Sequence, residues 1–209
     1  MSLPRSVNPP EPRSPTAFDP TDPALIATRV WLERAVIGLN LCPFAKAVHA
    51  TGRIRYRVSH ATTPDQLLAE LSDELRLLAT ADPEQIDTTL LIHPQVLTDF
   101  LEYNDFLDVV DAAVEALGLV DVLQVASFHP QYRFADTEPD DISNYTNRSP
   151  YPTLHLLRHA SVDRAVAAFP DAATIFDANI ETMRRLGYRR WRRLFGDSAE
   201  GDRSTDATG

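Results

Sequence analysis

Two histidines of this chain stand in the same local setting, at the end of an apolar segment and directly before a proline. His93 follows Thr89–Ile92, and His129 follows Val122–Phe128. Proline holds the residue before it in an extended geometry and stops a strand at that point. Because open α/β sheets form their pockets at the carboxyl ends of strands, we expect both imidazoles at one edge of a sheet. Either ring would then serve as a catalytic acid–base group.

A third histidine, His155, completes a candidate metal site. It lies near the start of the apolar segment 153–158, which we expect to begin at the same edge of the sheet. A metal site needs two or three neutral imidazoles that converge on one point. We therefore predict His93, His129 and His155 as ligands of a divalent metal, namely zinc, iron or manganese. The alternative is that each ring is a hydrogen-bonded structural histidine.

A polar loop ahead of His155 carries side chains suited to an anion. Asn144, Asn147, Arg148 and Ser149 group within it. A planar guanidinium with amide and hydroxyl neighbours suits two-pronged recognition of a carboxylate or phosphate. These four residues are therefore predicted to bind a small anionic substrate. The alternative is a loop that hydrogen-bonds its own backbone.

Cys42 is the only cysteine of the sequence. Pro43 suits a first helical position, so Cys42 is expected at a helix cap. Backbone N–H groups and the nearby ammonium of Lys46 would favour the thiolate there. We predict a catalytic nucleophile or a further metal ligand, provided that the loop reaches the histidines. The alternative is a small buried hydrophobe.

Strand and helix patterns alternate in the region that must position these residues. The order strand, helix, strand, helix, strand predicts parallel pairing through right-handed crossovers. No crossover helix precedes the fourth strand, which is therefore expected to be antiparallel. We expect an α/β fold, with α+β as the alternative, in which helices cover a mixed sheet of three parallel strands and one antiparallel strand. The expected strands are 53–58, 88–93, 121–128 and 153–158, and the main expected helices are 21–38, 63–78, 95–117 and 172–186.

The length and composition predict a single globular domain over residues 21–195. The chain has 209 residues, which is enough for one sizeable core. Segments 1–20 and 196–209 are rich in proline or small polar residues and are expected to be disordered tails. The link 130–152 is long, but its tyrosines and phenylalanine favour an ordered path over a floppy one.

The charge and cysteine content limit the partners and the compartment. A net charge of −10 disfavours nucleic acid and anionic membranes. One segment runs against this trend, because arginines surround aromatic residues between 184 and 193 and would suit a polyanion. A single cysteine, with no recognisable export signal or membrane-length apolar segment, predicts a cytoplasmic protein without a membrane partner.

Several strings together resemble a bacterial family catalogued as domain of unknown function fourteen-fifteen. They are Leu39–Ala45, His93-Pro94 with Phe100 and Tyr103-Asn104, Gln124–Pro130, and Asn144–Pro152 with His155. The resemblance covers about residues 24–191, and it implies one domain in a cytoplasmic bacterial setting. It carries over no catalytic residue and no cofactor.

These features favour a small-molecule enzyme over two other functions. In the leading interpretation, His129 or His93 acts as acid–base or metal ligand, Arg148 and Asn147 bind an anionic substrate, and the link 130–152 covers the pocket. The second interpretation is a non-catalytic module that senses a metabolite in the same pocket. The third is an interaction protein whose arginines bind a polyanion.

Overall fold

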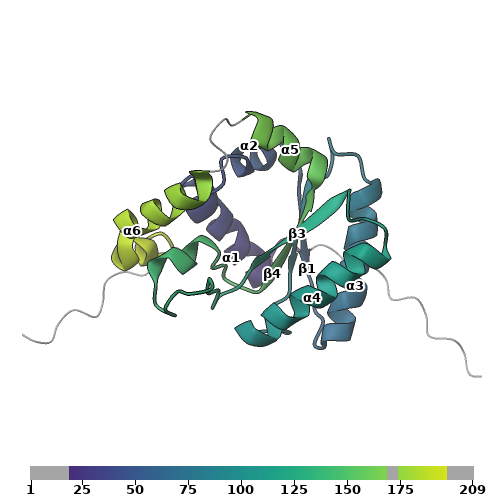
Figure 1. The fold of residues 1–209 in the computed structure, drawn as a ribbon, viewed down its shortest axis with the longest axis horizontal. Coiled ribbons are helices and arrows are strands. Elements are labelled where there is room, and N and C mark those ends of the chain that lie inside the picture. The colour runs from purple at the N-terminus through teal and green to yellow at the C-terminus, as the bar shows by residue number, and fades with distance from the viewer. Residues whose placement is uncertain (1–18, 169–173, 197–209) are drawn as a thin grey trace, which may run out of the picture.

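The computed structural model describes residues 19–168 and 174–196. The predicted tails therefore lie almost entirely outside the described residues. Within these residues, no helix is both long and apolar enough to cross a membrane. The elements form a single four-stranded sheet with helices on both of its faces (Figure 1).

The sheet has the strand order β1-β2-β4-β3 and confirms a mixed α/β architecture. β1 and β2 pair parallel, whereas β4 pairs antiparallel with both β2 and β3. The expectation of three parallel strands is corrected to one parallel pair. The reason is that β4 inserts between β2 and β3, so β3 has no parallel neighbour. The strands are β1 (Ile54–Val58), β2 (Thr88–Ile92), β3 (Leu123–Phe128) and β4 (Thr153–Arg158).

Two long amphipathic helices, α3 (Pro64–Thr80) and α4 (Phe100–Ala116), cover one face of the sheet (Figure 1). The Thr63 hydroxyl caps α3 by accepting the Gln66 N–H, and the Asp99 carboxylate caps α4. Their apolar stripes form the first core with the strands beneath. Its fully buried members include Leu67, Leu71, Leu75, Leu78, Leu91, Tyr103, Leu154 and Leu156.

The α4 helix begins later than its apolar spacing predicts. The sequence favoured a start at Gln95, but residues 94–99 form a turn in which Leu97 has a positive φ of 55°. Asp99 accepts the N–H groups of Leu101 and Glu102, and this cap fixes the true start of the helix. Residues 95–98 therefore keep their carbonyl groups outside the helix.

The opposite face of the sheet carries a second core. Helix α1 (Pro23–Trp31) continues directly into a π-helical segment, η1 (Leu32–Ile37), and packs there with α6 (Ile175–Arg193). The Trp31 ring meets Phe128 of β3 edge-on, with ring centroids 5.2 Å apart. The two remaining α-helices among the described residues are short: α2 (Ala45–Ala50) and α5 (His159–Ala168).

The link between β3 and β4 contains the 3-10 helix η2 (Ile142–Thr146). Asp141 caps η2 by accepting the Ser143 N–H. The Tyr145 ring then packs against Tyr188 and Trp191 of α6, with both centroid distances at 5.4 Å. These contacts anchor the link on the second core.

Candidate functional site

The ends of β2 and β3 bring His93 and His129 together. Both strands run opposite to β4, so both end at the edge where β4 begins. The Tyr103 ring of α4 lies against both imidazoles, with centroids 5.7 Å from His93 and 5.0 Å from His129. Both histidines are fully buried. We call His93, Tyr103 and His129 the strand-end cluster.

His93 presents a free ring nitrogen inside this cluster. Its Nδ1 lies 2.9 Å from the Val96 carbonyl oxygen, and a carbonyl only accepts, so Nδ1 carries the hydrogen. Nε2 therefore holds a lone pair, and it is buried without a hydrogen-bond partner among the described residues. Burial lowers the pKa of His93 to about 4. The ring is neutral at ordinary pH and can accept a proton or a hydrogen bond at Nε2.

His129 has the opposite tautomer and no free nitrogen. The Gln131 N–H donates to its Nδ1 at 3.0 Å, so Nε2 carries the hydrogen and donates to the Leu97 carbonyl at 3.3 Å. Burial also lowers the pKa of His129. With both nitrogens engaged, this ring has neither a free lone pair nor a free N–H group within the cluster.

Tyr103 is the member of the cluster that was not predicted as a site residue, although it is among the residues that carry the family resemblance. Its hydroxyl donates to the Thr153 carbonyl oxygen at 3.0 Å, and burial raises its pKa. Its position in the apolar stripe of α4 made it look like an ordinary core residue. The signal that was missed is a phenol hydroxyl in a fully buried stripe, since a buried tyrosine hydroxyl needs a partner.

Aromatic side chains cover the His129 side of the cluster. Phe100 lies 5.5 Å from the His129 ring and 5.4 Å from Tyr132, measured between centroids. Tyr132 in turn meets Phe134 at 5.1 Å. The start of the link between β3 and β4 therefore closes over the strand ends and keeps water away from His129.

His155 does not join the other two histidines. It is the third residue of β4 and lies opposite Leu90 and Ala126. Leu154 and Leu156 face the core beneath α3 and α4, so strand alternation turns His155 to the opposite face. Its Nε2 lies 2.8 Å from the Thr88 hydroxyl oxygen, and burial lowers its pKa to about 4.

The predicted metal site is therefore not assembled. Two of its three ligands share one face of the sheet, and the third lies on the other. Among residues 19–168 and 174–196, no group of three or more histidine, cysteine, aspartate or glutamate side chains is placed to hold a metal ion.

Cys42 also lies away from the strand-end cluster. Helix α2 begins at Ala45 with Phe44 at its cap position, so Cys42 precedes the helix instead of capping it. The half-buried thiol packs against the second core, on the face of the sheet opposite Tyr103. This environment fits the alternative of a small apolar side chain.

The four residues predicted to bind an anion instead hold the link together. The Arg148 Nε donates to the Tyr132 carbonyl at 3.1 Å and its Nη2 to the Pro139 carbonyl at 2.6 Å, while the guanidinium carbon lies 4.3 Å from the Tyr145 ring centroid. The loop therefore hydrogen-bonds its own backbone. The other three side chains also bond to the backbone. The Asn144 side-chain oxygen accepts the Phe134 N–H, and the Asn147 amide donates to the Ser127 carbonyl at 3.4 Å. The Ser149 hydroxyl donates to the Tyr151 carbonyl at 2.6 Å.

Fold and site together define a single-sheet α/β protein with a buried histidine–tyrosine cluster at the ends of two strands. The family described as Protein of unknown function (DUF1415) matches residues 24–193. The chain belongs to this family, as the strings in its sequence suggested. No curated protein and no solved structure matches the chain.

Proposed function

We propose that the protein is an enzyme that acts on a small molecule and that His93 Nε2 accepts a proton from the substrate. The observation that carries this proposal is the buried, unpartnered Nε2 of a neutral imidazole whose other nitrogen is fixed by the Val96 carbonyl. A backbone carbonyl on Nδ1 is the usual way in which proteins direct the lone pair of the other nitrogen.

A purely structural role explains this nitrogen poorly. Leaving a buried acceptor without a hydrogen bond costs about 1–3 kcal/mol, and most buried polar atoms have a partner. Among the buried histidines, His129 uses both nitrogens and His155 Nε2 contacts Thr88. Five further buried side-chain atoms of the described residues also lack a hydrogen-bond partner, but His93 Nε2 is the one that belongs to an imidazole. An imidazole nitrogen that lacks a hydrogen-bond partner at the end of a strand is typical of a ligand-binding position.

We further propose that the substrate is anionic. An isolated base with a pKa of about 4 is weak near neutral pH. A negative charge beside the ring would favour the imidazolium and raise the pKa of His93 toward the working pH. Arg148 is not the anchor in this proposal, because its guanidinium is tied to the link.

The proposed reaction relies on His93 without a metal ion, and we place the protein in the cytoplasm. His93 offers the one free imidazole nitrogen of the strand-end cluster, and a single ligand does not make a metal site. The cytoplasmic location rests on the single cysteine, which favours a reducing compartment.

Proton transfer can be tested directly with a panel of small carboxylates and phosphate esters followed by ¹H NMR in D₂O. We expect at least one compound to be chemically altered or to exchange hydrogen for deuterium in the presence of the protein. The variant His93→Gln should abolish the effect, whereas His155→Gln, which changes the buried histidine on the other face, should preserve it.

Two outcomes would redirect the proposal. Equal turnover by wild type and His93→Gln would remove His93 from the chemistry. Binding that depends on His93 without any turnover would support the metabolite-sensing module in place of an enzyme.

A further inference from the structure

The outer side of β3 carries backbone groups that the sheet does not use. β3 lies at the edge of the sheet, with β4 as its only neighbouring strand. The His159 N–H donates to the Val122 carbonyl at 3.0 Å, in register with the β3–β4 ladder. Bonded pairs alternate along an antiparallel ladder, so the even-numbered residues bond to β4 and residues 123, 125 and 127 face outward.

Both ends of this outer edge are closed by the chain itself, and the middle is open. The Leu123 N–H donates to Leu119 O at 2.9 Å, and the Ser127 carbonyl accepts from Asn147 Nδ2 at 3.4 Å. Among the described residues, no partner outside the ladder reaches the Val125 N–H, the Val125 carbonyl, the Leu123 carbonyl or the Ser127 N–H. The alternation of two donors and two acceptors matches what one added strand requires.

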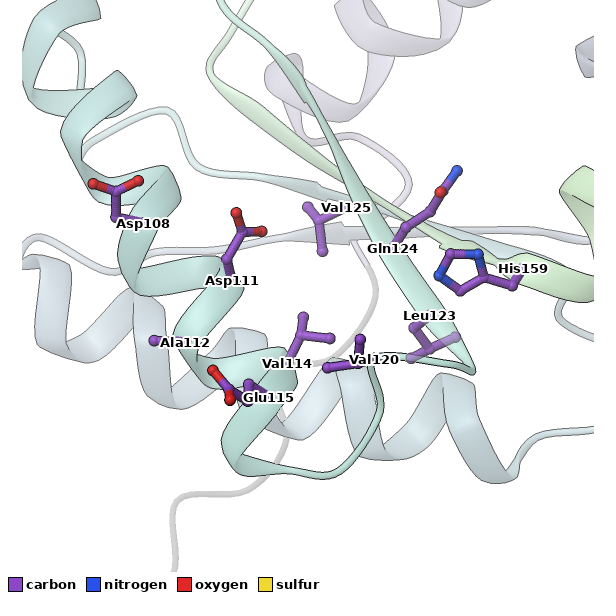
Figure 2. Close-up of a pocket in the computed structure, with 10 residues that line it drawn as sticks. All are labelled: Asp108, Asp111, Ala112, Val114, Glu115, Val120, Leu123, Gln124, Val125 and His159. Carbon is purple, nitrogen blue, oxygen red and sulfur yellow. The ribbon is translucent and has the colours of Figure 1, made fainter.

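A groove of about 700 Å³ runs beside this open edge, between β3 and the C-terminal half of α4 (Figure 2). Its apolar part includes Val125 from the strand, Val114 from the helix and Val120, which is 55% exposed. An exposed valine beside an unpaired strand edge is a typical docking feature, because natural proteins usually blunt such edges with charge or cover.

The helix side of the groove is acidic. Asp108, Asp111 and Glu115 line it, and His159 is the only basic side chain among its lining residues. None of the three carboxylates forms an ion pair within the part of the chain that the structure describes. Figure 2 shows Asp111 extending from α4 toward the part of the groove where Val125 lies. The groove therefore complements a positively charged occupant.

We propose that the outer edge of β3 and this groove bind an extended, basic segment of another protein by strand addition. Backbone hydrogen bonds to Val125 supply affinity, as in other added strands. Successive side chains of the added strand point to opposite faces, so every second residue faces α4. Lysine or arginine at those positions meets Asp108, Asp111 and Glu115, and its methylene chain passes the valines of the groove. The residues between them point to the opposite face of the sheet.

The probe for this proposal is a fluorescently labelled peptide of alternating lysine and valine, followed by anisotropy. We expect saturable binding, and a peptide with glutamate in place of lysine should not bind. The variant Asp111→Lys should weaken binding by about tenfold, because it places a like charge against the peptide. Asp105→Lys changes the same charge on an exposed turn of α4 outside the groove and should have a much smaller effect.

Backbone pairing is tested by N-methylation of alternate peptide residues. Only alternate N–H groups of an added strand face β3. Methylation of that set of N–H groups should abolish binding, and methylation of the other set should be tolerated. Hydrogen exchange of the Val125 amide should slow when the peptide binds.

Three results would overturn strand addition. Equal losses for Asp111→Lys and Asp105→Lys would show adhesion to net charge alone. Tolerance of methylation at both sets of N–H groups would exclude pairing with the edge. A dimer in sedimentation that Asp111→Lys dissociates, without peptide binding, would assign the groove to a second copy of the chain.

Discussion

Arg148 is held by two backbone carbonyls and one aromatic ring, so its removal should weaken the fold. We expect Arg148→Ala to lower the free energy of unfolding by about 1–2 kcal/mol, because the Tyr132 and Pro139 carbonyls lose a charged donor. Lysine cannot bridge two carbonyls with a planar fork, so Arg148→Lys should recover only part of the loss. Urea unfolding measures both variants. Unchanged stability would revive the interpretation of Arg148 as a substrate anchor.

Tyr103 links the two histidines to β4 through a single hydroxyl. Tyr103→Phe keeps the ring between His93 and His129 but leaves the Thr153 carbonyl without its donor. We expect a loss of about 1 kcal/mol in stability with the histidine tautomers preserved. Imidazole ¹⁵N chemical shifts report the tautomers. A switch of the His93 tautomer in this variant would mean that the phenol hydroxyl, and not Val96, directs the lone pair.

The sequence predicted that His93 and His129 lie at one edge of the sheet, but it did not predict their tautomers or hydrogen-bond partners. His93 and His129 each follow a strand by one residue, and that spacing was enough to place them at one edge. Their tautomers depend on the carbonyls of Val96 and Leu97, and apolar spacing alone places both residues inside a helix. Within a helix begun at Gln95 those carbonyls would be used by the next turn. His155 failed as a ligand because strand alternation reverses its face.

The cap of α4 controls the strand-end cluster. Asp99 starts the helix at Phe100 and so leaves the Val96 and Leu97 carbonyls free for the imidazoles. Asp99→Ala should cost about 1 kcal/mol of stability and also disturb the ¹⁵N shifts of both histidines. Asp99→Asn retains a side-chain acceptor and should preserve both. A stability loss without any histidine response would separate the cap from the cluster.

The kink in α6 depends on a glycine. Gly187 has φ 66° and ψ 164°, a region that is essentially restricted to glycine, and it turns the helix so that Trp191 reaches the second core. An added Cβ would meet no atom within 4 Å, so the penalty of Gly187→Ala is backbone strain alone. We expect a loss of about 1–3 kcal/mol in urea unfolding. Arg185→Ala, an exposed change on the same helix, should be nearly neutral.

The sequence marked Gly187 as the end of the last helix, because glycine commonly follows a helix C-terminus. In the structure the helical turns resume beyond it as far as Arg193. The difference arises from Tyr188 and Trp191, which pack on Tyr145 of η2. Those contacts come from a segment more than forty residues earlier in the chain, and local propensity does not contain them. All six arginines between 184 and 193 are exposed, and four of them, Arg189, Arg190, Arg192 and Arg193, lie on the resumed turns.

The sheet divides the molecule into two chemical environments, one on each face. The strand-end cluster lies on the face covered by α3 and α4, and Cys42 and His155 lie on the other. Periodicity predicted all four strands, but it could not predict that β4 inserts between β2 and β3. That choice depends on pairing between distant segments, and it decides both the number of parallel pairs and the open edge of β3.

The buried histidines on the two faces of the sheet predict a loss of stability in mild acid. His93 and His155 are buried and neutral, each with a pKa lowered to about 4 by burial, whereas an unfolded histidine titrates near 6.5. Below about pH 6.5 the unfolded chain takes up protons that the folded chain refuses, so stability falls as the pH falls toward about 4 and these two groups add no change above pH 7.

Urea unfolding between about pH 7 and pH 5.5 should therefore show a decrease of roughly 2 kcal/mol from these two groups together. This range lies above the titration of most carboxylates, which keeps their contribution small. His155→Gln retains a polar contact for Thr88 and cannot titrate, so it should remove about half of the decrease that His93 and His155 cause together. The lowered pKa of His129 adds a decrease of the same sign in both proteins. A stability profile that is flat over this range would mean that both imidazoles take up protons in the folded protein, and with them the case for a neutral His93 base would fall.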